Sequence, residues 1–295
     1  MGALIAVGAL ILLMLIGLPV AFSFAGMIVV LSFFYNLNFD ALMLTPYRSL
    51  NSVVLMALPL FILAGYLMQS GGIARRLIDF IASMVGRMKG GLGMSMVLSA
   101  SIFGAISGTA TAAVAAIGTI MIGPMAERGY SRAYTSALLG ISSLLGILIP
   151  PSITMILFAA VTRQSVAACF AATIGPGILL IIGLCIANVL MYRGYSEKDQ
   201  HKAKLLDTRE IPNFLPSTRK AMPALTLPVI ILGGIYGGIF TPTEAAAVAA
   251  LCAFIVGFFI YRVLDLSSLW NGILSAAETT GVIMVILLFS LVVAR

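Results

Sequence analysis

The chain has 295 residues, of which 61% are hydrophobic and only 9% are charged. Soluble domains carry about 25% charged residues, so this composition excludes an ordinary soluble protein and indicates an all-α protein that crosses a membrane several times. The net charge of +7 does not indicate nucleic-acid binding, because the basic residues stand between apolar runs, where they report topology.

Long apolar segments predict membrane helices along the chain. We expect spans at 2–17, 19–35, 51–70, 133–162, 166–192, 222–240, 243–262 and 276–293. Between two of them, residues 73–88 place apolar side chains at helical spacing with charged side chains interspersed. This pattern predicts an amphipathic helix that lies in the membrane interface.

The uncharged segment 91–126 is the first of two that break at a polar centre. As a straight helix it would be roughly 54 Å long, against about 30 Å of hydrocarbon, yet it is too short for two full spans. We therefore expect a re-entrant hairpin with its tip at Ser107, Gly108, Thr109 and Thr111. Glycine lets carbonyls point inward and hydroxyls add oxygen ligands, which suits Na⁺. Alternatively, these small residues only let helices pack closely.

The second uncharged segment, 133–162, breaks at Gly146, Pro150, Pro151 and Ser152. The two prolines remove consecutive amide donors, so we expect carbonyls of the preceding turn to lack partners. In hydrocarbon such carbonyls are costly unless something binds them. The half-helix that follows points its positive end at the break, which suits a carboxylate. The alternative is a simple proline kink without a binding function.

The distribution of basic residues orients these segments. If the ends of the hairpin face the cytoplasm, nearly all Lys and Arg residues fall on the cytoplasmic side, and only Arg48, Arg163 and Arg295 fall on the other. This asymmetry places the N-terminus in the periplasm.

The polar segment 193–221 then becomes a cytoplasmic loop between two halves. We expect a first membrane repeat at 1–192 and an incomplete second repeat at 222–295. The helix pairs that turn at Pro19 and at Pro242 run in opposite directions, as an inverted repeat requires.

Four segments carry a resemblance to a known family: Pro59–Gly65, Ile106–Thr109, Gly146–Ser152 and Phe240–Ala246. They resemble, in the same order, segments of the large membrane subunit of tripartite ATP-independent periplasmic (TRAP) transporters, the DctM-like proteins. The similarity covers nearly the whole chain. It implies an elevator-type fold with inverted repeats and a location in the bacterial inner membrane.

The resemblance also implies a function. The chain would be a permease subunit, not an enzyme, in Na⁺-driven uptake of carboxylate-bearing solutes such as C4-dicarboxylates, sialates or sugar acids. Na⁺ would be the coupling ion, with no cofactor. The implied partners are a periplasmic substrate-binding protein, a small membrane subunit and the lipid bilayer, with no nucleic acid. The residues implied to bind sodium or substrate are Ser107, Gly108, Thr109, Thr111, Ser143, Gly146, Pro150, Pro151 and Ser152.

One departure from the family pattern concerns length. The family has a second hairpin and a second double proline, whereas this sequence has one of each and stops at Arg295, inside the second repeat. We therefore expect a truncated permease, and a remnant that does not transport is the alternative to an active subunit.

Two other classes of function compete with transport. An intramembrane enzyme would need a nucleophile with a base, a carboxylate pair or a metal set, and the single histidine, His201, lies in a polar loop. A passive channel can also contain broken helices, but the apparent inverted halves favour alternating access.

Overall fold

The computed structural model describes residues 2–35, 44, 46–48, 50–196 and 212–294, and within these residues the chain forms helices without any strand. In chain order they are α1 (Gly2–Leu15), α2 (Val20–Phe34), the 3₁₀ turn η1 (Val53–Met56), α4 (Ala57–Ser70), α5 (Ile73–Val85), α6 (Gly91–Ser107), α7 (Ala110–Glu127), α8 (Arg132–Ser143), α9 (Leu145–Leu148), α10 (Ile153–Thr162), α11 (Val166–Ser196), α13 (Phe214–Tyr236), α14 (Pro242–Ile255), the π-helical turn η2 (Val256–Ile260) and α15 (Leu266–Val293).

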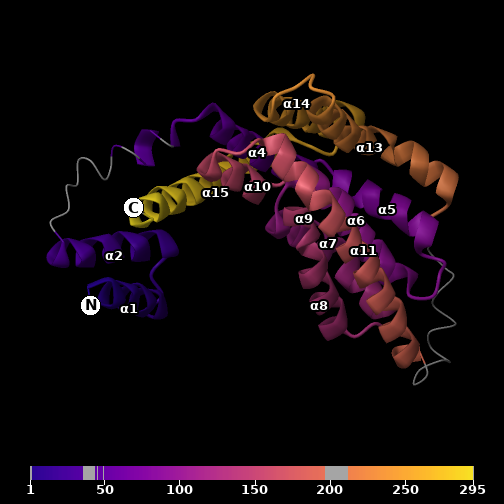
Figure 1. The fold of residues 1–295 in the computed structure, drawn as a ribbon. Coiled ribbons are helices and arrows are strands. Elements are labelled where there is room, and N and C mark those ends of the chain that lie inside the picture. Colours follow the sequence, from indigo (N-terminus) through magenta and orange to yellow (C-terminus); the bar gives the residue numbers. More distant parts are fainter. Residues whose placement is uncertain (1, 36–43, 45, 49, 197–211, 295) are drawn as a thin grey trace.

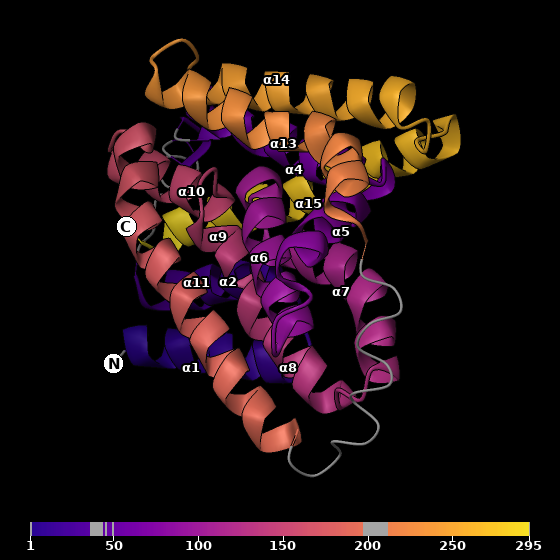
Figure 2. The same cartoon turned by 90° about the vertical axis from the view of Figure 1, so that its right-hand side faces the viewer.

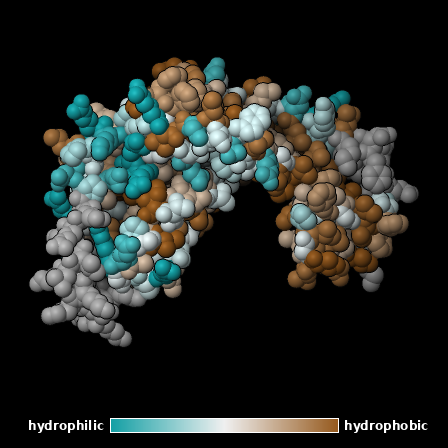
Figure 3. All heavy atoms as spheres, turned by 180° about the vertical axis from the view of Figure 1, so that it is seen from behind, coloured by the Kyte–Doolittle hydropathy of each residue, from teal (hydrophilic) through white to brown (hydrophobic). Residues whose placement is uncertain are grey.

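The helices form a small part and a large part. The helices α1 and α2 pack on each other and lie apart from the rest, and α15 connects them to the large part through its contacts with α2 and α4 (Figure 1). Helices α5 to α11 make up the large part, and α13 and α14 lie side by side across one end of it (Figure 2). Hydrophobic residues dominate the surface on the side of α1 and α2 (Figure 3), as expected of helices that face lipid.

Five helical stretches are long and apolar enough to cross a membrane: Val53–Ser70, Ala110–Glu127, Val166–Met191, Pro242–Ile260 and Leu266–Val293. A sixth span results if Arg132–Leu148 and Ile153–Thr162, which meet at a bend of 42°, are counted together. The prediction of an all-α protein that crosses a membrane several times is therefore confirmed.

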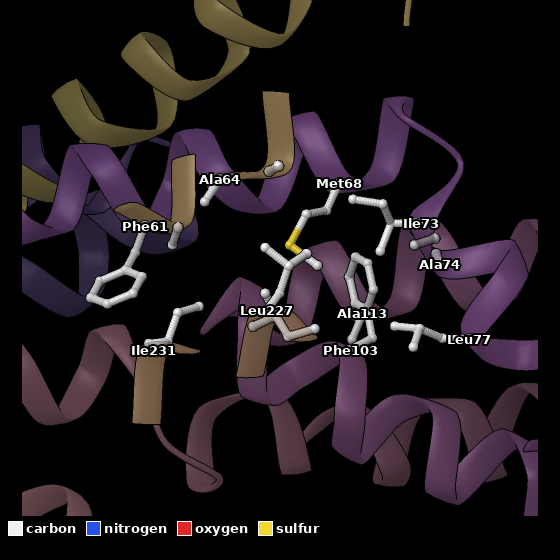
Figure 4. Close-up of a cluster of buried hydrophobic side chains, with 14 of the residues drawn as sticks. Phe61, Ala64, Met68, Ile73, Ala74, Leu77, Phe103, Ala113, Leu227 and Ile231 are labelled. Carbon is white, nitrogen blue, oxygen red and sulfur yellow. The ribbon is translucent and has the colours of Figure 1, made fainter. Parts of the chain in front are cut away.

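The largest buried side chains gather where α4, α5, α6 and α13 meet. Phe61 and Met68 of α4 point toward Leu227 and Ile231 of α13, and Phe103 of α6 lies beside them (Figure 4). Each of these five side chains is at most 1% exposed. In a membrane such side chains stabilise the helix contacts by close van der Waals packing, so this cluster holds α13 against the first half of the chain.

The predicted amphipathic helix is present as α5. Its apolar side chains Ile73, Leu77 and Ile81 are at most 3% exposed, and the helix contacts α6 and α13. The apolar face is therefore covered by protein.

Three helix ends extend beyond the predicted boundaries. The last helix begins at Leu266 and not at 276, because the Asp265 side chain accepts a hydrogen bond from the Ser268 amide at 2.9 Å and caps the first turn. Helices also enter both ends of the predicted loop 193–221, since α11 ends at Ser196 and α13 begins at Phe214. The segment 197–211 lies outside the described residues.

A buried amide links residues on either side of the 91–126 segment. Asn188 of α11 is 1% exposed; it donates a hydrogen bond to the Gly90 carbonyl at 2.8 Å and accepts one from the Tyr134 hydroxyl at 2.7 Å. Gly90 directly precedes α6, and Tyr134 lies in the first turn of α8, just after α7 has ended. Both ends of the segment therefore lie at one end of the bundle, and the segment is a helical hairpin.

The side of the membrane that these ends face can be tested with single cysteines at Lys89 and Arg128, in a background without the three native cysteines. Both positions flank the hairpin among basic residues, so we expect both to resist membrane-impermeant thiol reagents in intact cells and to react after permeabilisation. Labelling of one position and protection of the other would show a full crossing.

The Asn188 bridge predicts a stability effect. Asn188→Ala leaves the buried Gly90 carbonyl and the half-buried Tyr134 hydroxyl without their partner, so the free energy of unfolding should fall by about 1–3 kcal/mol. Gly93→Ala should act similarly, because its Cβ would overlap the Asn188 amide oxygen, whereas Gly183→Ala on α11 meets nothing within 4 Å. Denaturant unfolding of the purified protein measures the difference; equal stability of Gly93→Ala and Gly183→Ala would contradict this prediction.

Candidate functional site

The tip of the hairpin is a two-residue turn. Helix α6 ends at Ser107, and Gly108 has a φ of 66°, the left-handed conformation that glycine adopts without a steric penalty. Thr109 is extended and caps α7, because its hydroxyl accepts a hydrogen bond from the Ala112 amide at 3.2 Å. The turn falls within the predicted tip.

The break between α9 and α10 satisfies part of its own backbone. Pro150 and Pro151 cannot donate to the carbonyls of Gly146 and Ile147. The Ile147 carbonyl nevertheless accepts a hydrogen bond from the Ser152 hydroxyl at 2.5 Å and a longer one from Thr154 at 3.3 Å. The prediction that the released carbonyls lack partners is therefore wrong for Ile147, because a hydroxyl five residues on replaces the missing amide.

The tip and the break lie against each other, backbone to backbone. The Gly108 carbonyl accepts a hydrogen bond from the Ile153 amide at 3.2 Å. A Cβ on Gly104 would overlap the Gly146 Cα, and a Cβ on Gly146 would lie 2.7 Å from the Thr109 carbonyl oxygen. Only glycine allows this approach, which brings the two predicted regions into one site.

Four helix ends converge at this contact. Helices α6 and α9 end here, so their last carbonyls lack helical partners and carry partial negative charge. Helices α7 and α10 begin here, so their first amides carry partial positive charge. One small region can thus hold a cation on carbonyl oxygens and an anion on amide groups.

Most of the predicted site residues are buried at this junction. Ser107 and Ser152 are fully buried, and Thr109 is half-buried. The other buried residues are Gly108, Gly146, Pro150 and Pro151. The Ser107 hydroxyl makes only a long hydrogen bond, 3.5 Å to the Thr109 carbonyl. A buried hydroxyl held so weakly is available to a cation.

Two predicted residues lie away from the contact itself. Thr111 is exposed on α7. Ser143 lies one turn before Gly146, at the end of α8, and donates to the Gly140 carbonyl at 2.7 Å within its own helix. The structure therefore brings seven of the nine predicted residues, namely Ser107, Gly108, Thr109, Gly146, Pro150, Pro151 and Ser152, to one junction.

The site also includes one residue that the sequence interpretation did not identify. Gly65 of α4 lies against the tip, since a Cβ there would be 3.2 Å from the Ser107 Cβ. Elsewhere on the two helices that lead to the junction, the hydroxyls of Ser142 on α8 and Ser99 on α6 are buried without a hydrogen-bond partner among the described residues. Adjacent serines at 142 and 143 inside an apolar segment were a signal for polar function there.

Comparison with known proteins identifies the family that the sequence motifs resemble. The sequence pattern of the "Tripartite ATP-independent periplasmic transporter, DctM component" matches residues 7–294. A C4-dicarboxylate TRAP transporter large permease protein of Pseudomonas aeruginosa is 42% identical over 79% of this chain and 53% of its own length. The corresponding protein of Rhodobacter capsulatus is 34% identical over 100% of this chain and 70% of its own length.

A sialic acid TRAP transporter permease protein of Haemophilus influenzae is 33% identical over 96% of this chain and 46% of its own length. The chain thus spans about half the length of several curated relatives that it matches.

The close approach of the hairpin tip to Gly146 predicts that two glycine substitutions in neighbouring turns differ in their effect on stability. Gly146→Ala should force the tip away from the break and weaken the bond between Gly108 and Ile153, lowering the free energy of unfolding by about 1–3 kcal/mol. Gly140→Ala, where nothing lies within 4 Å of the added Cβ, should be neutral or stabilising. Denaturant unfolding and hydrogen exchange at the Ile153 amide measure both effects. If the two variants are equally stable and equally protected, the contact is looser than described.

Proposed function

The chain belongs to the family of the DctM component of tripartite ATP-independent periplasmic transporters, and on this basis we propose that it is a permease subunit that couples uptake of a carboxylate-bearing solute to Na⁺. The family is a transporter component, and the several apolar helices agree with a multi-pass protein of the bacterial inner membrane. The observation that carries the proposal is the convergence of four helix ends at the contact between the hairpin tip and the broken helix.

Carbonyl and hydroxyl oxygens at this contact suit Na⁺. We assign the ion to the side on which α6 and α9 end, where Pro150 cannot donate to the Gly146 carbonyl and where the Ser107 hydroxyl is buried with one long bond. A cation there also neutralises the partial negative charge of the two helix ends. This environment supports an alkali-cation site without any acidic side chain.

The side on which α7 and α10 begin suits a carboxylate. Two helix N-termini point their positive ends into the same region. The names of the relatives specify a C4-dicarboxylate and sialic acid, and both are carboxylic acids. We therefore propose an organic acid as the solute, with the Na⁺ ion beside it contributing attraction to its charge.

The proposed domain organisation keeps the hairpin and the broken helix in one repeat. We propose a first membrane repeat at 1–192 that contains the hairpin and the broken helix, a cytoplasmic connection between α11 and α13, and a second repeat that includes α13, α14 and α15. In an elevator-type movement, the hairpin and the broken helix would carry the bound ion and solute together. A periplasmic binding protein that delivers the solute and a small membrane subunit complete the proposed tripartite system.

Sodium dependence tests the proposed ion site. In the complete transporter, assembled with its binding protein and small subunit, Ser107→Ala removes a buried oxygen ligand and Thr109→Ala removes both an oxygen and the cap of α7. We expect each to raise the Na⁺ concentration for half-maximal uptake roughly five-fold or more, equivalent to about 1 kcal/mol.

Thr119→Ala is the matched control, because that hydroxyl donates to carbonyls of its own helix, nearly three turns from the tip. Uptake by reconstituted vesicles at graded Na⁺ concentrations gives the values. Unchanged Na⁺ dependence in both tip variants would assign these residues to packing, and an equal change in Thr119→Ala would show a general effect on α7.

A further inference from the structure

A groove lies between the start of α5, the start of α13 and the end of η2, away from the hairpin tip. Its cavity has a volume of about 800 Å³, and three basic side chains line it: Arg76, Arg219 and Lys220. They come from segments that are far apart in the sequence, and hydrophilic residues gather on this part of the surface (Figure 3). Concentration of positive charge in one cavity indicates an anionic ligand.

One of the three basic side chains, that of Arg76, is held in place by its neighbours. The Arg76 guanidinium lies 3.8 Å from the centre of the Tyr261 ring and donates to the Gly72 carbonyl at 3.0 Å. The Tyr261 hydroxyl donates to the Lys220 carbonyl at 2.8 Å. One aromatic ring therefore links α5 to α13, and a cation held on a ring in this way needs little further ordering when it binds a ligand.

One carboxylate lies close to these cations. Asp79 lines a smaller adjoining cavity of about 230 Å³ together with Arg76 and Lys220. Burial raises the pKa of Asp79, while the charges of Arg75, Lys220 and Arg76 oppose that rise. A single half-buried carboxylate does not balance the basic residues of the two cavities, so the groove stays positive.

The walls of the groove beside the cations are apolar. Leu215 is 80% exposed and Ile260 is 53% exposed, and both line the cavity. A free phosphate or another small anion gains nothing from such walls. A lipid with a charged headgroup and acyl chains matches both the cations and the apolar surface.

We propose that this groove binds an anionic glycerophospholipid, with the headgroup phosphate at Arg76, Arg219 and Lys220 and an acyl chain along Leu215 and Ile260. The lipid would bridge three segments, α5, α13 and the end of η2, and so stabilise their junction. Basic pockets between helices at the cytoplasmic surface are typical sites for such headgroups, and the topology predicted from the sequence puts these residues on that side.

Native mass spectrometry and thermal unfolding of the purified chain test the proposal. Dioleoyl phosphatidylglycerol should bind and raise the unfolding temperature, whereas dioleoyl phosphatidylcholine and inorganic phosphate should not. The double substitution Arg219→Gln with Lys220→Gln removes two exposed charges, and we expect about 30-fold weaker phosphatidylglycerol binding, from about 1 kcal/mol per charge. Arg87→Gln with Lys89→Gln is the matched control, because it removes the same charge from exposed residues outside the groove.

Leu215→Gln tests the apolar wall separately and should weaken binding of the two-chain lipid while the fold is kept, since Leu215 is 80% exposed. If the control double substitution weakened phosphatidylglycerol binding as much as the groove double substitution, the binding would reflect general charge attraction, and the proposal would be overturned. Equal stabilisation by inorganic phosphate would identify a free anion as the ligand, and equal binding of the two lipids would remove the role of headgroup charge.

Discussion

Backbone groups released at helix breaks are the constraint on which the rest of this structure depends. A carbonyl or an amide without a partner is costly in an apolar environment, and this chain interrupts its helices twice at buried positions. It meets the constraint in two ways: the Gly108 carbonyl of the tip accepts a hydrogen bond from the Ile153 amide of the break, and within the break the Ser152 hydroxyl donates to the Ile147 carbonyl. Because the tip and the break satisfy each other, the hairpin and the broken helix are one structural unit.

This arrangement explains the residue types at the junction. The contact needs the absence of a side chain at Gly104 and Gly146, where a Cβ would collide with backbone that cannot turn aside. Gly108 must also adopt a positive φ. Because these glycines have no side chains, backbone atoms face the site. Backbone carbonyls can bind a Na⁺ ion, and backbone amides can bind a carboxylate. The packing requirement and the proposed binding function therefore select the same small residues.

Local signals in the sequence were enough to predict the helices, the two breaks and the amphipathic α5, because hydropathy, glycine and proline act over a few residues. They could not predict how the broken segments meet, since the Asn188 bridge spans 54 residues to Tyr134 and 98 residues to Gly90. The partner of the Ile147 carbonyl was missed for another reason: proline was considered only as the loss of a donor, and the hydroxyl of Ser152 was not considered as its substitute. The early start of α15 had a local signal, the Asp265 cap, which the apolar run beginning near 276 obscured.

The two polar contacts lie at opposite ends of the hairpin, and this placement limits how the unit can move. Asn188 holds the base, where Gly90 and Tyr134 meet, and the bond between Gly108 and Ile153 holds the tip. A hairpin fixed at one end could swing away from α8 and α10, but one fixed at both ends separates only if buried hydrogen bonds break. The elevator-type movement proposed above therefore requires α6 to α11 to travel as one body, with the Na⁺ ion and the solute held between elements whose mutual positions do not change.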